Sequence, residues 1–92
     1  MTARLVRYEG HVQGVGFRYT VKSIARGFEV SGTVRNLPDG RVELVAASAD
    51  PEELEAFLHD IAVDSPLAHH IKRVETQQIP APGGLRGFEI IS

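Results

Sequence analysis

The chain has 92 residues, enough for one small domain that buries roughly 60 to 65% of its unfolded surface. Its formal net charge of -2 gives no electrostatic reason to expect a nucleic acid or an anionic membrane as a partner. Because the chain has no cysteine, disulfides, thiolate catalysis and cysteine-ligated metals are excluded. No apolar run approaches the length of about 20 residues that spans a membrane, and the N-terminus lacks the apolar core of a signal peptide. We therefore expect a soluble, cytoplasmic protein; the absence of cysteine alone would also fit an extracellular one.

The first elements are a strand and a helix joined by a short turn. Alternating apolar and polar residues predict a strand over residues 4–12, and apolar residues at helical spacing predict a helix over residues 17–26. Gly27 is expected to end this helix in the left-handed conformation. The side of the strand predicted to face the core carries Val6, Tyr8, Gly10 and Val12.

The turn between them, rich in glycine, has the character of an anion site. Gly14 and Gly16 lack a Cβ and can adopt positive φ, so successive backbone N–H groups can converge on one point. The helix that follows adds a partial positive charge of roughly half an elementary charge. Arg18, in its first turn, supplies a planar fork of donors that matches phosphate oxygens. Taken alone, such a turn is more often plain loop geometry; together with Arg18 and the motif over residues 32–43 described below, it favours phosphate binding. The predicted phosphate-binding residues are Gln13, Gly14, Val15, Gly16, Phe17 and Arg18.

The remaining elements follow from clear start and stop signals. Strands are predicted over residues 29–36 and 41–47, with residues 37–40, Leu-Pro-Asp-Gly, as the hairpin turn between them. A second helix is predicted over residues 51–63, with Asp50 as N-cap, Pro51 in the first helical position and Glu53 completing a capping box. An irregular stretch over residues 67–71, a strand over 72–79, a loop and a short strand over 87–91 complete the chain.

This order predicts an α+β fold of one domain over residues 1–92. Strand–helix–strand–strand–helix–strand with a short final strand is typical of a ferredoxin-like, split-βαβ sandwich with both helices on one face of an antiparallel sheet. The first two strands then run parallel with the third between them, so their C-terminal ends share one edge, with backbones about 10 Å apart. Arg18 and Asn36 would both reach one small ligand at that edge.

Two motifs resemble the acylphosphatases, small enzymes that hydrolyse the carboxyl-phosphate bond of acyl phosphates. The first is Gly-His-Val-Gln-Gly-Val-Gly-Phe-Arg over residues 10–18, and the second is Gly-Thr-Val-Arg-Asn-Leu-Pro-Asp-Gly-Arg-Val-Glu over residues 32–43. The closing Gly-Phe-Glu-Ile over residues 87–90 is also typical. The resemblance implies that Arg18 binds the phosphate and that Asn36 orients the attacking water. One departure is Thr33, where relatives often carry an aromatic residue; we expect it to alter a wall near the site or an exposed patch, and not the chemistry.

The residues also suggest a hydrolysis without metal or cofactor. The turn contains neither an acid nor the Lys-Ser/Thr pair that holds magnesium in nucleotide phosphate loops. The carboxylate of an acyl phosphate leaves readily, so no general acid is required. The amide of Asn36 cannot take up a proton at neutral pH, so its role would be to orient water.

Other functions were weighed against this one. A non-catalytic anion-binding module shares the fold, and a related domain begins the much longer hydrogenase-maturation carbamoyltransferases; the short chain favours a free-standing enzyme. A nucleic-acid binder would need stacking aromatics on the sheet and basic surroundings, and the net charge of -2 argues against this function.

Arg35 and Arg41 are predicted to be solvated charges of the hairpin, and the four histidines are predicted to lie on the surface. The expected partner is a small acyl phosphate, with no nucleic acid and no membrane, and the expected state is a monomer.

Overall fold

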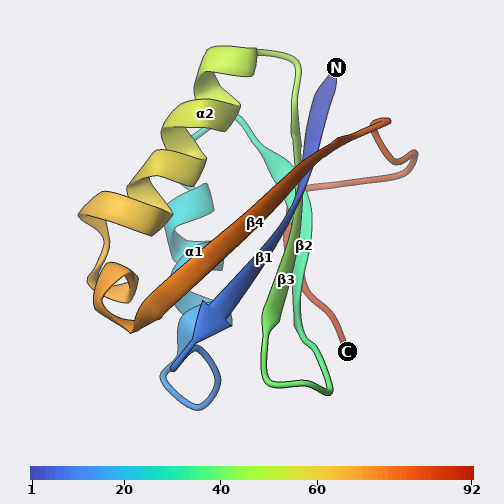
Figure 1. The fold of residues 1–92 in the computed structure, drawn as a ribbon. Helices are drawn as coiled ribbons and strands as arrows, with labels where there is room; N and C mark the ends of the chain where they lie inside the picture. Colours follow the sequence, from blue (N-terminus) through green and yellow to red (C-terminus); the bar gives the residue numbers. More distant parts are fainter.

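The structure, a computed structural model, describes residues 1–92 and contains two helices packed on a five-stranded sheet (Figure 1). A π-helical turn, Asp60–Asp64, continues α2, and a 3-10 helix, Pro66–His70, leads into β4. Neither α-helix has the length and apolar character needed to cross a bilayer. The elements in chain order are β1 (Thr2–Gly10), α1 (Phe17–Ala25), β2 (Ser31–Asn36), β3 (Val42–Ser48), α2 (Pro51–His59), β4 (Ile71–Ile79) and β5 (Phe88–Ile90).

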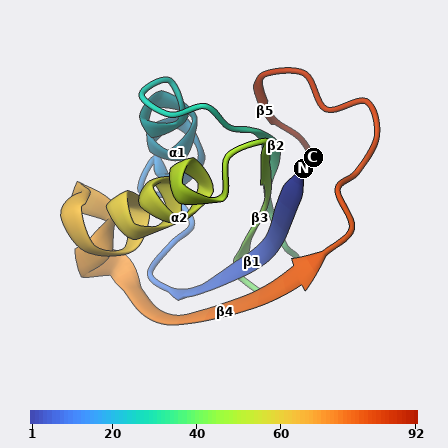
Figure 2. The same ribbon diagram turned by 90° about the horizontal axis from the view of Figure 1, so that it is seen from above.

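The strand order, β4-β1-β3-β2-β5, is that of the predicted split-βαβ sandwich. β3 lies between β1 and β2 and runs antiparallel to both, so β1 and β2 are parallel to each other. Both helices cover the same face of the sheet, as Figure 2 shows from above. The fold class is confirmed with one correction: β5 pairs parallel with β2, so the sheet is mostly, and not entirely, antiparallel.

One hydrophobic core lies between the helices and the sheet. The predicted inward side chains of β1 and the following turn, Val6, Tyr8 and Val12, are each at most 2% exposed. The ring of Tyr8 packs on Phe17 with ring centres 5.1 Å apart, and burial raises the pKa of the Tyr8 hydroxyl above its ordinary value. Phe17 therefore anchors the start of α1 to the same core that holds β1.

The predicted N-cap of α2 is confirmed, but the capping box is not. The Asp50 carboxylate accepts the Glu52 N–H at 2.9 Å, and Pro51 opens the helix. The Glu53 carboxylate accepts the N–H of Glu29 at 2.9 Å instead of reaching back to Asp50. The Asp50 N–H donates to the Ser48 hydroxyl at 3.0 Å, so that hydroxyl replaces Glu53 in the cap.

The prediction that Gly27 ends α1 in the left-handed conformation is wrong. Gly27 does not adopt positive φ. The N–H groups of Arg26, Gly27 and Phe28 each donate to the carbonyl three residues earlier, at 3.0 to 3.2 Å. These 3-10 bonds satisfy the last carbonyls of the helix, so a left-handed residue is not required. The stretch predicted as irregular over residues 67–71 is also corrected, because Ser65 accepts the Leu67 N–H at 3.1 Å and starts the 3-10 helix there.

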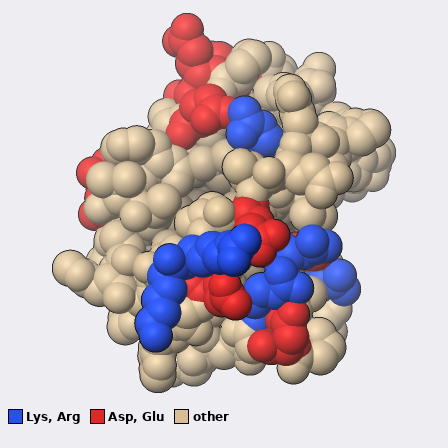
Figure 3. Space-filling model, in the orientation of Figure 1, with Lys and Arg blue, Asp and Glu red and all other residues tan.

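The face of the sheet without helices carries an ion-pair network across its three central strands. Glu43 on β3 is 8% exposed and accepts from Arg7 on β1 and Arg35 on β2, each at 3.1 Å. Arg35 is therefore paired and half-buried, and Arg41 is likewise half-buried and paired with Asp39, which corrects the prediction of both as solvated charges. In Figure 3, Lys and Arg side chains lie interleaved with Asp and Glu over the lower part of the molecule.

Candidate active site

The loop between β1 and α1 combines two left-handed glycines with backbone N–H groups that have no protein acceptor. Gly14 and Gly16 have φ of 81° and 76°, in the left-handed region that favours glycine. The N–H of Thr20 donates to the Gly16 carbonyl at 3.0 Å and is the first in α1 to have a backbone acceptor. The preceding N–H groups, from residue 14 to residue 19, donate to no protein acceptor. Such a run of free N–H groups at a helix start is what an anion requires.

The space beside this loop is free of other protein atoms. A Cβ added to Gly14 or Gly16 would meet no heavy atom within 4 Å. Between and after these glycines the side chains turn inward: Val15 packs against the core and Phe17 is 2% exposed. The loop is thus held by its apolar side chains while its backbone borders open space.

Arg18 lies in the first turn of α1, next to the free N–H groups. Its side chain is half-buried and has no carboxylate within 4.0 Å. The first turn of α1 contains no acidic residue. The charge of this guanidinium is therefore not neutralised by the protein, in contrast to Arg41, whose side chain lies 2.7 Å from the Asp39 carboxylate. The hydrogen bond from Arg41 holds the pKa of Asp39 below its usual range.

Asn36 is the last residue of β2 and lies at the same edge of the sheet as the loop. It shares the helix-covered face with the buried Val34. Asn36 and Tyr8 pair with the same residue of β3, Val42, from opposite sides. The half-buried amide of Asn36 makes no hydrogen bond to the protein. The split topology thus brings a free amide to the edge at which Arg18 lies.

Gln13 joins the two halves of the candidate site. Its Nε2 donates to the Leu37 carbonyl at 2.9 Å and to the Arg41 carbonyl at 3.0 Å, on either side of the hairpin turn. Leu37 directly follows Asn36. Gln13 therefore ties the loop to the Asn36 hairpin, a connection that sequence spacing alone did not reveal.

The histidines stand apart from this arrangement. His11 is exposed, as predicted, but its ring lies 6.0 Å from that of His70, and its N–H donates to the His70 carbonyl at 2.9 Å. His59 lies 3.4 Å from Asp64. No group of three or more His, Cys, Asp or Glu side chains is placed to share a metal ion.

The candidate site is a shallow loop and not an enclosed pocket. None of the five cavities of the molecule is lined by a residue of the 13–18 loop or by Asn36. A phosphate group is small and charged, so binding one does not in general require a deep apolar pocket.

Comparison with known proteins identifies the family. A family model described as acylphosphatase matches residues 5–90. The chain belongs to the acylphosphatase family. It is 45% identical over 86 residues to an acylphosphatase from Thermococcus kodakarensis, covering 94% of this chain and 91% of that protein. Its fold matches the crystal structure of acylphosphatase from Bacillus subtilis with a TM-score of 0.87 and 30% identity over the whole of both chains.

A second structural match lies within a larger protein. The T. kodakarensis HypF structure matches with a TM-score of 0.82 and 36% identity, covering all of this chain and 12% of that one. The same fold is thus found in a protein of about this length and within a much longer chain. As an acylphosphatase, the chain is a hydrolase that acts on acid anhydrides.

Proposed function

We propose that this acylphosphatase hydrolyses the carboxyl-phosphate bond of small acyl phosphates to a carboxylate and inorganic phosphate, at a site formed by residues 13–18 and Asn36. The observation that carries the proposal is the juxtaposition at one sheet edge of free backbone N–H groups, an unpaired Arg18 and an unpaired Asn36 amide. The polar groups there either donate hydrogen bonds to an anion or belong to a neutral amide. No carboxylate lies among residues 10–18 to repel phosphate.

Binding of the phosphate group falls to the loop. The N–H groups from residue 14 onward and the partial positive charge of the α1 start would contact its oxygens. Arg18 would add two parallel charge-assisted hydrogen bonds. Phosphoryl transfer asks the protein mainly for positioning and charge stabilisation, which these groups supply. We assign the binding of the phosphate group to Gln13, Gly14, Val15, Gly16, Phe17 and Arg18.

Asn36 would orient the attacking water. An amide both donates and accepts hydrogen bonds but does not titrate, so it fixes the direction of a water molecule without removing its proton. The proton would pass to a phosphate oxygen or to solvent. The leaving carboxylate is stable as an anion, so the reaction needs no general acid, and we expect it to proceed without a metal or cofactor.

The test is a steady-state assay of benzoyl phosphate hydrolysis by the wild type and Asn36→Ala, with inorganic phosphate as competitive inhibitor. We expect Asn36→Ala to lower kcat by roughly 10²-fold or more while the phosphate inhibition constant stays nearly unchanged, because the amide acts on water and not on phosphate. An unchanged kcat, or a phosphate affinity that falls as much as kcat, would assign Asn36 a different role.

Three broader predictions accompany the proposal. The single core supports one domain over residues 1–92. The absence of cysteine fits a cytoplasmic location. We expect a monomer, with a small acyl phosphate as the only partner that the reaction needs.

A further inference from the structure

The positive charges of α1 stand apart from the rest of the chain. Residues 10–28 carry Arg18, Lys22 and Arg26 and no Asp or Glu. The chain as a whole has a formal charge of -2, so the remaining residues carry five negative charges net. A basic helix on an otherwise acidic protein sets up a local field that favours anions.

These three cations share one side of α1 and remain unpaired. Their spacing of four residues aligns them along the helix, where like charges repel. None of them has a carboxylate within 4.0 Å. Five other arginines of the chain do form ion pairs, namely Arg4, Arg7, Arg35, Arg41 and Arg73. Apart from Lys72 and Arg86, the folded chain pairs its other Lys and Arg side chains with carboxylates and leaves this row free.

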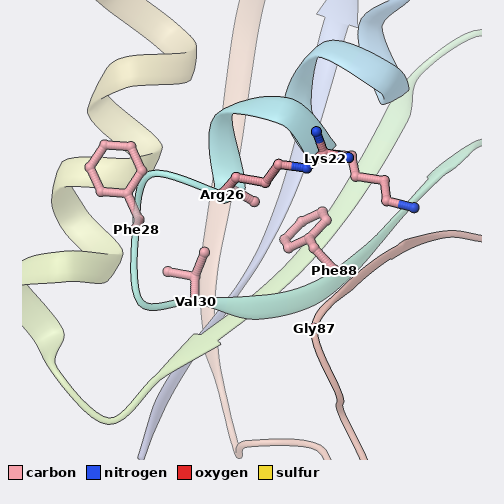
Figure 4. Close-up of a pocket in the computed structure, with 7 residues that line it drawn as sticks. Lys22, Arg26, Phe28, Val30, Gly87 and Phe88 are labelled. Atoms are coloured by element: carbon pink, nitrogen blue, oxygen red, sulfur yellow. The ribbon is translucent and has the colours of Figure 1, made fainter.

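A cavity of about 290 Å³ opens beside the last two cations of the row. Figure 4 shows Lys22 and Arg26 extending from α1 on the same side as Phe88, with Phe28 and Val30 across the hollow. Phe28 and Phe88 both pack on the buried ring of Phe57, at 5.8 and 5.6 Å between ring centres. The cavity therefore has an aromatic floor held by Phe57 and a rim with two unpaired positive charges.

The geometry points to a second binding site here, for a small carboxylate with an aromatic or short aliphatic body. The apolar body would lie on Phe88 and Val30, and the carboxylate would reach Lys22 and the guanidinium fork of Arg26. The volume is at the lower end of the range for ligand pockets, which favours a single ring or short chain over a nucleotide. None of the residues that line the cavity belongs to the proposed phosphate site.

Helix stabilisation alone would explain only part of this arrangement. Lys22 and Arg26 lie near the C-terminal end of α1, where cations interact favourably with the helix dipole. That role needs neither the cavity nor its aromatic floor. It also predicts that removal of both charges lowers stability without any effect on a ligand, which separates the two explanations by experiment.

The experiment is a titration with benzoate followed by amide proton–nitrogen NMR spectra, with saturating inorganic phosphate present to occupy the loop. We expect shifts at Val30, Gly87 and Phe88 with a dissociation constant in about the millimolar range. Acetate lacks the apolar body and benzyl alcohol lacks the charge, so each should bind at least about tenfold more weakly. The double variant Lys22→Gln/Arg26→Gln should weaken benzoate binding by at least about tenfold. The matched control is Lys72→Gln, because Lys72 is an exposed and unpaired cation on β4. This variant should leave the dissociation constant for benzoate unchanged.

Several results would overturn the inference. Shifts confined to residues 13–18 and Asn36 would place benzoate at the phosphate site. Equal benzoate binding by the double variant, or no shift at about 100 mM benzoate, would leave the cavity without a role in carboxylate binding. The spectra themselves report whether the double variant is folded, so a loss of structure is distinguished from a loss of binding.

Discussion

Gln13 is the residue on which the geometry of the candidate site depends most. Arg18 follows the loop and Asn36 precedes the hairpin turn, and these two segments are far apart in sequence. The two hydrogen bonds from the Gln13 amide to the hairpin carbonyls join them directly. Because both bonds use the side-chain N–H groups, Gln13 acts on the chemistry through position, and its contribution to the phosphate site would come from its backbone.

We predict that Gln13→Leu lowers kcat for benzoyl phosphate by roughly 10 to 100-fold. Leucine keeps the approximate volume but donates no hydrogen bond, so the hairpin that carries Asn36 is released from the loop. KM should change less than kcat, because Arg18 and the N–H groups remain. The matched control is Gln78→Leu, an exposed glutamine of β4 without a hydrogen bond to the protein. A kcat equal to that of the wild type would show that the two segments hold their places without Gln13.

The loop is the element whose backbone shape is most specific. Gly14 and Gly16 are both left-handed, yet neither is crowded, so glycine is required there by φ and not by lack of space. Gly32 is the opposite case: a Cβ there would lie 2.0 Å from the Val45 carbonyl oxygen on β3. The two recognised motifs thus contain glycines for two different physical reasons, one that shapes the anion loop and one that lets β2 approach β3.

We predict that Gly14→Ala lowers the free energy of unfolding by roughly 1–2 kcal/mol, because the left-handed conformation is unfavourable for a residue with a Cβ. Gly27→Ala is the matched control. Gly27 is not left-handed, and its added Cβ would make only an ordinary contact at 3.5 Å with the Ile24 carbonyl oxygen. That variant should be unchanged or more stable by about 0.4–1 kcal/mol, since alanine restricts the unfolded chain. Urea denaturation measures both, and equal losses in the two variants would contradict this account of the loop.

At the scale of the whole molecule, the sequence predicted the parts that depend on local pattern. Alternation along β1 reports burial directly, so Val6, Tyr8 and Val12 were predicted correctly to lie in the core. The order of elements then restricts the topology to a few choices, and the split-βαβ arrangement brings Asn36 to the edge that carries the loop. That juxtaposition required no side-chain detail.

The features that were missed depend on contacts between distant segments. Gly27 and Glu53 matched local end signals, but 3-10 bonds and the Ser48 hydroxyl satisfied the same backbone groups. Arg35 was predicted as a solvated charge because its partner Glu43 lies on another strand, in a register that only the folded sheet defines. The cavity under Lys22 and Arg26 likewise depends on where β5 and Phe88 pack, which no local pattern records.

The most direct test of the central claim is the hydrolysis of benzoyl phosphate in EDTA by the wild type, Arg18→Ala and Arg86→Ala. Arg86 is an exposed arginine without an ion pair, so its replacement controls for the loss of one positive charge. We predict full activity of the wild type and of Arg86→Ala in EDTA. For Arg18→Ala we predict a fall in kcat/KM of at least roughly 10² to 10³-fold, the usual cost of one preorganised electrostatic donor. A wild type that is inactive in EDTA, or an Arg18→Ala variant as active as the wild type, would contradict the account.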